Sequence, residues 1–466
     1  MNLKDAKYIY MIGIGGIGMS ALARIFKAQG KQVSGSDLKD SQITAELKSL
    51  GVKIFTGHQK ENLASKPDLV IYSQDVSSDS LGAVELNEAK KFNIPALTYA
   101  KALGLLMEGH FGIGVTGTNG KSTTSAILGL ILEKAGLDPT VVLGTQISPK
   151  NASGKFKANA RLGAGDYFVA EVDEYHRKML ETKPKMIVIT NIAEDHLDYY
   201  KDLEDIKNAF AEYINSLGED GILIYNADDH NTVEVCRNAA CHKFTFGIHH
   251  YSDLQAQNVV AGSGFQKFDL YLKNEPIGAF ELKVPGKFNI SNALGACLAA
   301  FKLGVDKKHA GQVLSEFAGT WRRFEQVGSI GGKIIISDYG HHPAGIAATL
   351  EGAAEFYPDK KILLVFQPHH RNRTKKLFED FVEALSKASE VIVPEIFDVA
   401  GREHGEEISS KMIVDELKAK GSAAEFTKDL DETENMIKKK LDSYDVVLLM
   451  GAGDIDLLAR RLVNES

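Results

Sequence analysis

The sequence predicts an α/β protein of three domains built on parallel sheets. The chain has 466 residues, and one domain per roughly 150 residues gives three. Apolar runs that read as buried strands alternate with helical stretches along the chain, which is typical of parallel sheets joined by crossover helices. The runs are residues 8–14, 69–72, 111–115, 167–172, 186–190, 221–225, 333–337, 362–366, 391–394 and 446–450.

Changes in this pattern divide the chain into three blocks. Residues 1–108 form the first block, which closes with a predicted helix. The second block, 109–320, begins at a glycine-rich turn and contains a stretch, 243–284, whose alternation indicates antiparallel strands. Residues 321–466 form the third block, which opens on WRRFE and ends near a buried strand. Short joints between the blocks leave mobile domains.

Composition restricts the classes of function. Lys and Arg total 54 against 62 for Asp and Glu, a net charge of −8, which argues against a general role on nucleic acid or membranes but allows a local basic pocket. The cysteines, Cys236, Cys241 and Cys297, lack CxxC spacing, so we expect neither disulfides nor a cysteine zinc site. Since no run of about 18 apolar residues or signal peptide is visible, we expect a cytoplasmic protein.

A phosphate-binding loop is the most specific motif. Residues 117–122 read GTNGKS between an apolar strand and a helix predicted over 123–135, and such a turn holds polyphosphates with its backbone N–H groups. We expect Lys121 to reach the β- and γ-phosphates and Ser122 to ligate Mg²⁺. Val115 stands where the usual spacing has glycine, so the loop is a variant. The predicted nucleotide ligands are Gly117, Thr118, Asn119, Gly120, Lys121 and Ser122.

A second glycine turn follows the first predicted strand. Residues 13–18 read GIGGIG, and Asp37 lies nineteen residues beyond the last glycine. Such a turn brings the backbone close to a diphosphate at a helix N-terminus. Two ligands compete for it, a nicotinamide cofactor and a UDP-linked substrate. The ATP loop in the next block disfavours a hydride-transferring enzyme.

Acidic residues follow two strands of the second block. Glu171 begins EVDE at a strand end, where a carboxylate binds Mg²⁺ between the β- and γ-phosphates. Asp195, His196 and Asp198 follow the strand at 186–190. Because ligands collect at the carboxyl ends of strands in open α/β sheets, we expect a second metal contact or a substrate contact there.

Basic residues gather in the third block. Arg322 and Arg323 follow Trp321 at the predicted joint, where a guanidinium would reach the γ-phosphate when the domains close. Two further clusters, each after a predicted strand, combine imidazoles, a phenol and guanidiniums, which suit an anionic, carboxylate-bearing substrate. The clusters are Asp338-Tyr339-Gly340-His341-His342-Pro343 and Gln367-Pro368-His369-His370-Arg371-Asn372-Arg373.

With these motifs assembled, the chain resembles the Mur ligase family over nearly its whole length. The segments that carry the resemblance are GIGGIGMSALA, GTNGKSTT, EVDEY, TNIAEDHLDYY, PGKFNISNALGA, WRRFE, DYGHHP, FQPHHRNRT and GAGDI. The resemblance implies a Rossmann-like N-terminal domain for a UDP substrate, a central P-loop ATPase domain and a Rossmann-like C-terminal domain for the incoming amino acid. The expected activity is an ATP-dependent acid–amino-acid ligase.

Within the family, the chain resembles the branch that joins L-alanine to the lactoyl carboxylate of UDP-N-acetylmuramate through an acyl phosphate, releasing ADP and phosphate. Phe210 stands where ligases for acidic or diamino residues carry a carbamylated lysine, which favours L-alanine. Two positions depart from the family pattern. Phe288 replaces a frequent histidine and His370 a frequent arginine, which puts an adenine contact and a substrate anion contact in doubt.

The family pattern also implies roles for individual residues. Those implied in catalysis are Lys121, Arg323, His341 and Arg373; those for ATP beyond the loop are Asn289, Asn292 and Arg323; those for Mg²⁺ are Ser122, Glu171 and His196. The implied substrate contacts are Gly15, Gly16, Ile17, Gly18, Asp37 and Ser73 for the UDP sugar, with Tyr339, His341, His369 and Arg373 around the reacting carboxylate and alanine.

Three other functions stay open at this point. A recycling ligase would attach a murein tripeptide to the same sugar nucleotide, although the GIGGIGMS form of the first turn favours alanine. A NAD-dependent oxidoreductase would use the GxGxxG turn. A non-catalytic nucleotide sensor would bind ATP without ligation. The presence of all four residues predicted for phosphate and metal chemistry, Lys121, Glu171, His196 and Arg323, argues against it. We expect no nucleic acid, no membrane insertion, and a monomer or homodimer.

Overall fold

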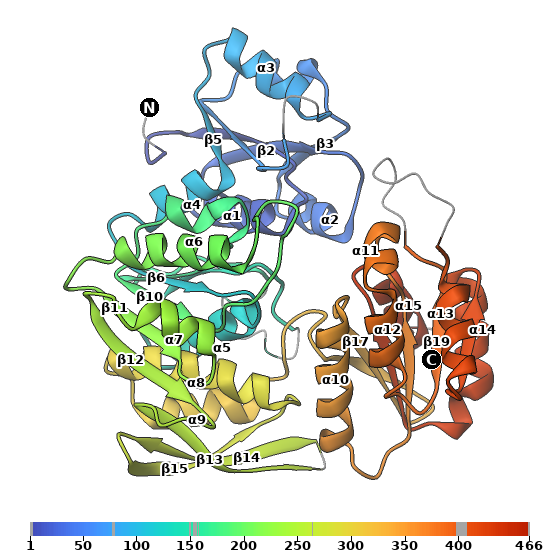
Figure 1. Ribbon diagram of the computed structural model, residues 1–466. Helices are drawn as coiled ribbons and strands as arrows, with labels where there is room; N and C mark the ends of the chain where they lie inside the picture. The colour runs from blue at the N-terminus through green and yellow to red at the C-terminus, as the bar shows by residue number, and fades with distance from the viewer. Residues whose placement is uncertain are drawn as a thin grey trace. The chain divides into compact units, whose positions relative to one another are not determined.

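The computed structural model describes residues 3–76, 80–148, 151, 156, 158–262, 264–397 and 408–464. It has three separate β-sheets with helices between their strands (Figure 1), so the predicted α/β class is confirmed. By compactness the chain forms two units, which are described separately. One is Met1–Asn258 with Phe268–Phe280 and Phe288–Glu316, and the other is Val259–Lys267 with Glu281–Lys287 and Phe317–Ser466. The domain boundaries at residues 108 and 320 stay predictions.

The first sheet has five parallel strands in the order β3-β2-β1-β4-β5. Alternate side chains of β1 pack into different clusters, Ile9 and Met11 with α1 and Tyr10 and Ile12 with α3, so helices cover both faces. The strands are β1 (Tyr8–Ile12), β2 (Gln32–Asp37), β3 (Lys53–Thr56), β4 (Leu69–Tyr72) and β5 (Ala96–Thr98). The helices are α1 (Ile17–Ala28), α2 (Gln42–Ser49), η1 (Lys60–Leu63), α3 (Ala83–Lys91) and α4 (Tyr99–Met107).

The second sheet has ten strands in the order β15-β14-β13-β12-β11-β10-β6-β9-β7-β8. Its strands are β6 (Phe111–Thr116), β7 (Thr140–Val142), β8 (Ala160–Arg161), β9 (Tyr167–Glu171), β10 (Met186–Ile189), β11 (Ile222–Asn226), β12 (His242–Gly247), β13 (Leu254–Gly262), β14 (Phe265–Leu272) and β15 (Glu275–Leu282). The helices are α5 (Lys121–Lys134), η2 (Tyr175–Glu181), α6 (Leu203–Asn215), α7 (His230–Cys236), α8 (Lys287–Lys302) and α9 (Lys307–Glu316).

One part of the expected antiparallel region is corrected by the structure. β12 pairs in parallel with β11 and also with β13, so the region predicted from residue 243 onwards is antiparallel only among β13, β14 and β15. Two residues separate β13 from β14 and β14 from β15, and connections this short join only antiparallel strands. An alternating sequence pattern shows that a strand is half exposed, but it does not show whether the neighbouring strand runs parallel or antiparallel to it.

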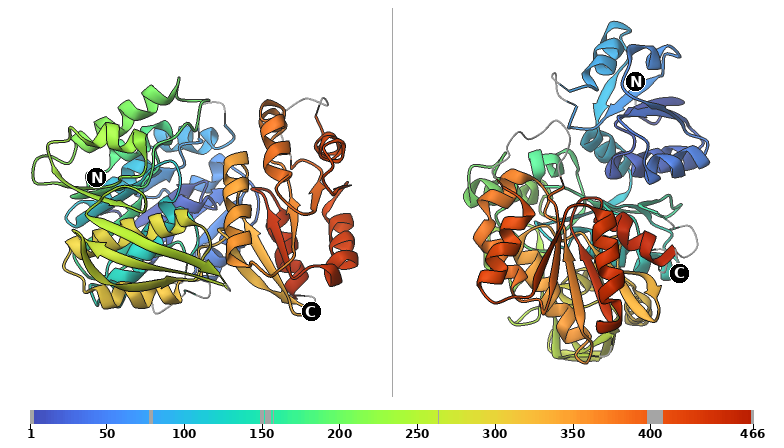
Figure 2. Two further views of the ribbon diagram at one scale, coloured as in Figure 1. Left: turned by 60° about the horizontal axis from the view of Figure 1, so that its bottom comes forward. Right: turned by 90° about the vertical axis from the view of Figure 1, so that its right-hand side faces the viewer.

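The third sheet has six strands in the order β16-β17-β21-β18-β19-β20, all parallel except for the β16·β17 pair. Two clusters lie on its opposite faces, one with α10, α12 and α13 and the other with α14 and α15 (Figure 2). The strands are β16 (Glu325–Ile330), β17 (Lys333–Asp338), β18 (Ile362–Phe366), β19 (Val391–Pro394), β20 (Ala424–Thr427) and β21 (Val446–Met450). The helices are α10 (Pro343–Phe356), α11 (Arg371–Lys376), α12 (Phe378–Leu385), α13 (Ser410–Ala419), α14 (Leu430–Lys440), η3 (Leu441–Ser443) and α15 (Ile455–Asn464).

Several helices begin at residues whose side chains cap them. The side chains of Ser41, Thr98, Asp202, Asp229 and Asp429 each accept a hydrogen bond from an amide in the first turn of the helix that follows. Such caps satisfy amides that have no partner within the helix, so the local sequence fixes where these helices start. No helix within the described ranges has the length and apolar character needed to cross a lipid bilayer.

Hydrogen bonds join the first two sheets within the first unit. The buried Asn159, directly before β8, donates from Nδ2 to Ile17 O at 2.6 Å and to Ser20 Oγ at 2.9 Å, both on α1. Gln146 donates from Nε2 to Glu46 Oε2 on α2 at 3.2 Å. The helix that follows the first glycine turn is therefore bonded to the central sheet.

Gly104 in the interior of α4 gives a stability prediction. Alanine in a helix is normally about 1 kcal/mol more favourable than glycine, but a Cβ at Gly104 would collide with the carbonyl oxygen of Glu181. We expect Gly104→Ala to lower the free energy of unfolding by about 1–3 kcal/mol, measured by urea denaturation. Gly345→Ala in α10 is the matched control, because a Cβ there meets no atom within 4 Å. If Gly104→Ala stabilised the protein as much as Gly345→Ala, the close packing of α4 on η2 would be wrong.

Candidate functional site

The phosphate loop connects β6 to the N-terminus of α5, as the sequence predicts. Gly117 and Gly120 have left-handed φ angles of +129° and +86°, a conformation that residues with a Cβ rarely adopt. Neither position has room for a Cβ, which would collide with Thr190 Oγ1 at Gly117 and with Asn292 Oδ1 at Gly120. The two glycines therefore bring the loop against the end of β10 and the start of α8.

The segment after β10 holds this loop in place. The Thr118 amide donates to Asn191 O at 2.9 Å, and the Asn119 amide donates to Asn191 Oδ1 at 3.0 Å. In return, Asn191 Nδ2 and Thr190 Oγ1 donate to Asn119 O at 2.9 and 2.5 Å. The amides of Thr118 and Asn119 are thus bonded to Asn191, and the loop leads directly into the start of α5, where a helix N-terminus suits phosphate.

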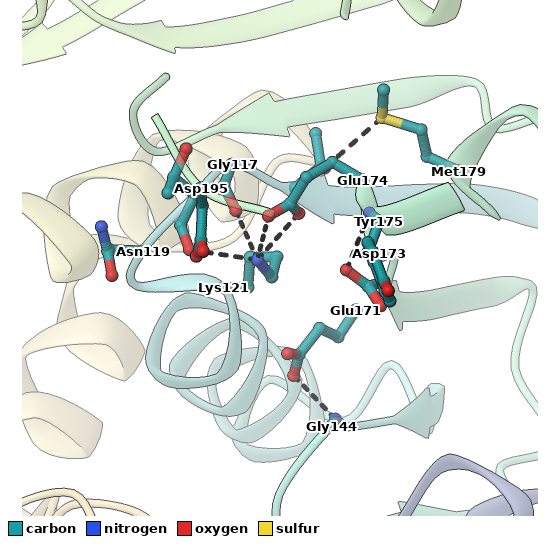
Figure 3. Close-up of polar contacts among 12 residues, drawn as sticks. Gly117, Asn119, Lys121, Gly144, Glu171, Asp173, Glu174, Tyr175, Met179 and Asp195 are labelled. Atoms are coloured by element: carbon teal, nitrogen blue, oxygen red, sulfur yellow. Dashed lines mark hydrogen bonds and ion pairs between the residues drawn. The ribbon is translucent and has the colours of Figure 1, made fainter. Parts of the chain in front are cut away.

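Lys121 is surrounded by oxygen atoms (Figure 3). Its Nζ donates to Glu174 Oε2 at 2.8 Å and Oε1 at 3.1 Å, and to the carbonyl oxygens of Gly117 at 2.6 Å and Thr118 at 3.2 Å. Burial alone would lower the pKa of Lys121, but the carboxylates of Glu174 and then Asp173 raise it above its usual value. The ammonium is therefore charged, and Glu174 is its counter-ion.

Ser122 and Glu171, two of the predicted metal ligands, are neighbours. Ser122 Oγ donates to Glu171 Oε1 at 2.9 Å, and the Gly144 amide donates to Glu171 Oε2 at 2.7 Å, a contact visible in Figure 3. The hydroxyl and the carboxylate both lie at the start of α5. Oxygen donors of this kind are the ligands that Mg²⁺ prefers.

His196, the third predicted metal ligand, lies beside the carboxyl groups of Asp173 and Glu174. Its Nε2 is 4.0 Å from Glu174 Oε1, and its ring stacks on Tyr175 with centroids 4.3 Å apart. One ligand atom from each of Asp173, Glu174 and His196 lies within 4.8 Å of the others. Burial acts to raise the pKa of Asp173, yet Lys121 and Lys178 hold it below its usual value. Burial raises the pKa of Glu174 in spite of Lys121, so Asp173 is the ionised oxygen ligand that this edge offers a cation.

The start of α8 packs against the phosphate loop. Asn292 Nδ2 donates to Asn289 Oδ1 at 3.3 Å, and both side chains are buried. Asn292 also occupies the space beside Gly120. Phe288, directly before this pair, is 44% exposed. The structure thus places the two predicted adenine-side residues next to the loop that would hold the phosphates.

The first glycine turn lies at the carboxyl edge of the first sheet. The Gly15 amide donates to Asp37 Oδ2 at 2.8 Å, and Ser73 follows the adjacent strand β4 next to Gly13. A Cβ at Gly18 would come within 2.7 Å of the Tyr99 ring, so the helix start is closely packed. The six residues predicted to contact the UDP sugar therefore occupy the carboxyl ends of β1, β2 and β4, which are neighbours in the sheet.

The basic residues of the third block collect at one edge of the third sheet. The segments after β17, β18 and β21 lie there because these strands are parallel neighbours. The guanidinium carbons of Arg322 and Arg323 lie 5.1 and 5.0 Å from the Tyr339 ring centroid. Arg322 Nη2 also donates to the carbonyl oxygens of Gly451 and Gly453. Arg322 is therefore fixed to the β21 loop, whereas Arg323 is exposed.

The pKa of His369 is affected by the positively charged side chains at this edge. Burial, and after it the charges of His370, Arg373, His341 and Arg322, lowers the pKa of His369 to about 4. Its Nδ1 is buried and finds no hydrogen-bond partner among the described residues. Cationic groups gathered in this way suit a carboxylate or phosphate ligand.

Sequence reasoning missed some residues of the site. Glu174 and Asp173 lie within the EVDE segment, but Glu171 was the residue predicted from it, and Asn191 was not singled out within TNIAEDH. The signal that could have found them is their place after β9 and β10, which flank β6 in the sheet. Spacing alone does not decide which of the three EVDE carboxylates faces Lys121.

Fold and site together define a P-loop nucleotide-binding α/β protein, with an acidic edge beside the loop, a second glycine turn on the first sheet and basic clusters on the third. Three family models match the chain in order: "Mur ligase family, catalytic domain" over residues 8–111, "Mur ligase middle domain" over 115–300 and "Mur ligase, glutamate ligase domain" over 322–453. The chain belongs to the Mur ligase family.

Curated relatives match over the whole length. A UDP-N-acetylmuramate–L-alanine ligase from Caldanaerobacter subterraneus subsp. tengcongensis is 38% identical over 100% of this chain and 99% of its own. The protein of the same name from Clostridium acetobutylicum is 39% identical over 97% and 96%. The crystal structure of the UDP-N-acetylmuramate–alanine ligase of Thermotoga maritima superposes with a TM-score of 0.83 at 31% identity, covering 98% of each chain. The predicted three-domain architecture is confirmed by these matches.

Gly120 provides a test of the phosphate loop. We expect Gly120→Ala to weaken ATP binding by roughly tenfold or more, because its Cβ would collide with Asn292 and its φ is +86°. Isothermal titration calorimetry measures the effect. Gly136→Ala is the control, since Gly136 also has a positive φ, +77°, but no atom within 4 Å of a Cβ. Equal affinity in the two variants would show that the loop does not bind the nucleotide in this form.

The lowered pKa of His369 predicts a pH effect on stability. Between about pH 4 and 6.5, the folded and ordinary pKa values of His369, the unfolded chain binds the extra proton. The stability that depends on neutral His369 is therefore present above pH 6.5 and lost as the pH falls through this window. We expect thermal midpoints between about pH 7 and about pH 5 to fall less for His369→Asn than for the original chain. If the thermal midpoints of the two proteins fell by the same amount over this pH range, the lowered pKa of His369 would be contradicted.

Proposed function

We propose that this chain is an ATP-dependent ligase that joins L-alanine to the lactoyl carboxylate of UDP-N-acetylmuramate, a step in peptidoglycan precursor synthesis. The observation that carries the proposal is the identity of 38% and 39%, spread over nearly the whole chain, to relatives named for this reaction. ATP and UDP sugars are the substrates, and for that reason we also propose a cytoplasmic location.

The reaction has two chemical steps. A lactoyl carboxylate oxygen attacks the γ-phosphorus of ATP, which forms an acyl phosphate and breaks the bond to ADP. The amine of L-alanine then attacks the acyl carbon, and the tetrahedral intermediate expels phosphate as the nitrogen loses a proton. Positioning and charge neutralisation supply most of the catalysis in such transfers. No general base is assigned.

Lys121 is the residue from which we expect the largest contribution. Its ammonium is desolvated and bonded to Glu174, and the γ-phosphate offers the same type of oxygen acceptor at the start of α5. We propose that Lys121 transfers hydrogen bonds from Glu174 to the β- and γ-phosphates. The triphosphate would then neutralise Lys121, and the buried Glu174 would need a new partner, since breaking a buried ion pair leaves its other member uncompensated.

We propose Ser122, Glu171 and His196 as the residues that hold Mg²⁺. The donor set fits a hard cation, because Ser122 Oγ and Glu171 Oε1 lie 2.9 Å apart at the helix start and the His196 cluster includes the carboxyl groups of Asp173 and Glu174. When bound, Mg²⁺ neutralises charge on the β- and γ-phosphates. The carboxylates of Asp173 and Glu174 are additional ligands available to it.

The remaining site residues divide between the substrates. The residues proposed to contact ATP are Gly117, Thr118, Asn119, Gly120, Asn289, Asn292 and Arg323. Those proposed for the UDP sugar are Gly15, Gly16, Ile17, Gly18, Asp37 and Ser73, and those for the reacting carboxylate and L-alanine are Tyr339, His341, His369 and Arg373. The cationic surroundings of His369 support an anionic ligand at the third sheet.

A second candidate is a murein peptide ligase that uses the same sugar nucleotide. It is favoured by the structure of UDP-N-acetylmuramate:L-alanyl-γ-D-glutamyl-meso-diaminopimelate ligase from Neisseria meningitidis, which is 27% identical with a TM-score of 0.60 over 68% of this chain. The lower identity and partial coverage make it the weaker candidate. Comparing L-alanine with the tripeptide as acceptor separates the two.

The proposed reaction predicts that phosphate release requires ATP, Mg²⁺, UDP-N-acetylmuramate and L-alanine together. Mass spectrometry should find the sugar nucleotide heavier by one alanyl residue. Lys121→Ala should lower kcat/KM by roughly 10²–10³-fold. Lys134→Ala is the control, because Lys134 lies at the other end of α5 and is 42% exposed. Turnover with the tripeptide but not with L-alanine would favour the second candidate, and phosphate release without either acceptor would contradict both.

A further inference from the structure

A buried carboxylate lies beneath the first glycine turn. Glu85 on α3 is 0% exposed, and its two oxygens accept five hydrogen bonds. Tyr10 Oη donates at 2.8 Å, Ser36 Oγ at 2.5 Å, Asn62 Nδ2 at 2.7 Å, His58 Nδ1 at 3.1 Å and the Gln59 amide at 3.3 Å. These donors come from β1, β2, η1 and the loop after β3. One carboxylate therefore connects two strands of the first sheet with η1 and with the loop that precedes it.

This carboxylate is ionised although no lysine or arginine among the described residues forms an ion pair with it. Burial acts to raise the pKa of Glu85, but the hydrogen bonds from His58, Ser36, Asn62 and Tyr10 outweigh it and keep the pKa below its usual value. A buried charge is costly unless hydrogen bonds satisfy it. A carboxylate held in this way orders its donors more strictly than an apolar side chain would.

The hydrogen bonds also fix the protonation of His58. Ser36 has one hydroxyl proton, which it donates to Glu85. His58 Nδ1 lies 3.0 Å from Ser36 Oγ and 3.1 Å from Glu85 Oε2, and both oxygens face it as acceptors. Nδ1 must therefore carry a proton. The imidazole is held in one orientation, and its side chain is only 6% exposed.

Ser36 connects the carboxylate to the glycine turn. Its carbonyl oxygen accepts the amides of Gly13 at 2.9 Å and Ile14 at 3.0 Å. The next residue, Asp37, accepts the amide of Gly15 at 2.8 Å. Three successive amides of the turn are thus bonded to the last two residues of β2. The Ser36 side chain, in turn, is bonded to Glu85.

We propose that Glu85 is a positioning residue for the sugar-nucleotide site, which fixes the end of β2 through Ser36 and His58 and thereby the shape of the turn at residues 13–18. The inference rests on the proposed function for the identity of the ligand, UDP-N-acetylmuramate. Glu85 itself is buried and does not touch the substrate. Its effect is to hold the turn through the bonded amides of Gly13, Ile14 and Gly15, so that the start of α1 beyond them is presented to the diphosphate.

Glu85→Gln tests the proposal, because it keeps the size of the side chain but turns one acceptor into a donor. The new N–H groups face the hydroxyl, imidazole and amide groups that donate to Glu85, so these groups must reorient or lose hydrogen bonds. We expect the Kd and KM for UDP-N-acetylmuramate to rise roughly tenfold, with kcat and the KM for ATP changed by less than about twofold. The amides of residues 13–16 should also exchange hydrogen faster than in the original chain.

Asp68→Asn is the matched control. Asp68 Oδ2 accepts the amides of Lys7 and Tyr8 at 2.9 Å each, at the opposite end of β1 from the glycine turn. We expect this variant to lose stability without a change in the KM for UDP-N-acetylmuramate. Ser36→Ala, which removes the hydrogen bonds of the Ser36 hydroxyl with Glu85 and with His58, should reproduce the substrate effect if Glu85→Gln does not fold.

The outcomes separate the inference from the proposed function. Failure of the original chain to bind UDP-N-acetylmuramate would contradict the function, and hydrogen exchange at residues 13–16 would still test the role of Glu85. Substrate binding and exchange within about twofold of the original in both Glu85→Gln and Ser36→Ala would overturn the inference and leave Glu85 a stabilising residue only. A rise in the KM for ATP as large as that for the sugar nucleotide would also overturn it.

Discussion

The left-handed backbone of the phosphate loop is the constraint on which the central site depends. Gly117 and Gly120 allow the chain to turn so sharply that Thr190 and Asn292 occupy the space of a side chain. This contact unites β6, β10 and α8, which are separated by more than half of the central domain in sequence. Once the loop is held between them, Asn191 bonds its amides and α5 begins where phosphate would lie. The position of Lys121 follows from that geometry.

Charge is distributed differently over the two kinds of ligand site. Around the phosphate loop, positive and negative groups are paired, as in Lys121 with Glu174. A bound triphosphate would therefore replace Glu174 as the partner of Lys121. At the edge of the third sheet, burial and the neighbouring His370, Arg373, His341 and Arg322 lower the pKa of His369. An anion bound there would relieve repulsion among these side chains as well as form new bonds. The proposed site at the phosphate loop would therefore exchange one ion pair for another, whereas the proposed site on the third sheet would gain a counter-ion.

The sequence predicts the parts of the fold that depend on local order. Long apolar strands, the GTNGKS loop and the clusters after β17 and β18 were found because strand, turn and helix follow one another directly. Strands that are short or rich in polar residues were missed, since they form no continuous apolar run; these are β2, β3, β5, β7, β8, β16 and β20. The pairing of His196 with Asp173 and Glu174 depends on strand order, which spacing does not encode. Glu85 reads as an ordinary exposed residue of a polar helix, and its donors lie up to 75 residues away.

The bonds from Asn159 to Ile17 and Ser20 have a mechanical consequence. They fasten the first turn of α1, the helix that carries the proposed sugar-nucleotide amides, to the strand β8 of the sheet that holds the phosphate loop. Movement of α1 away from this strand would have to break both hydrogen bonds of a buried side chain. The helix start proposed to meet the sugar nucleotide is therefore tied, within the first unit, to the same sheet that carries the phosphate loop.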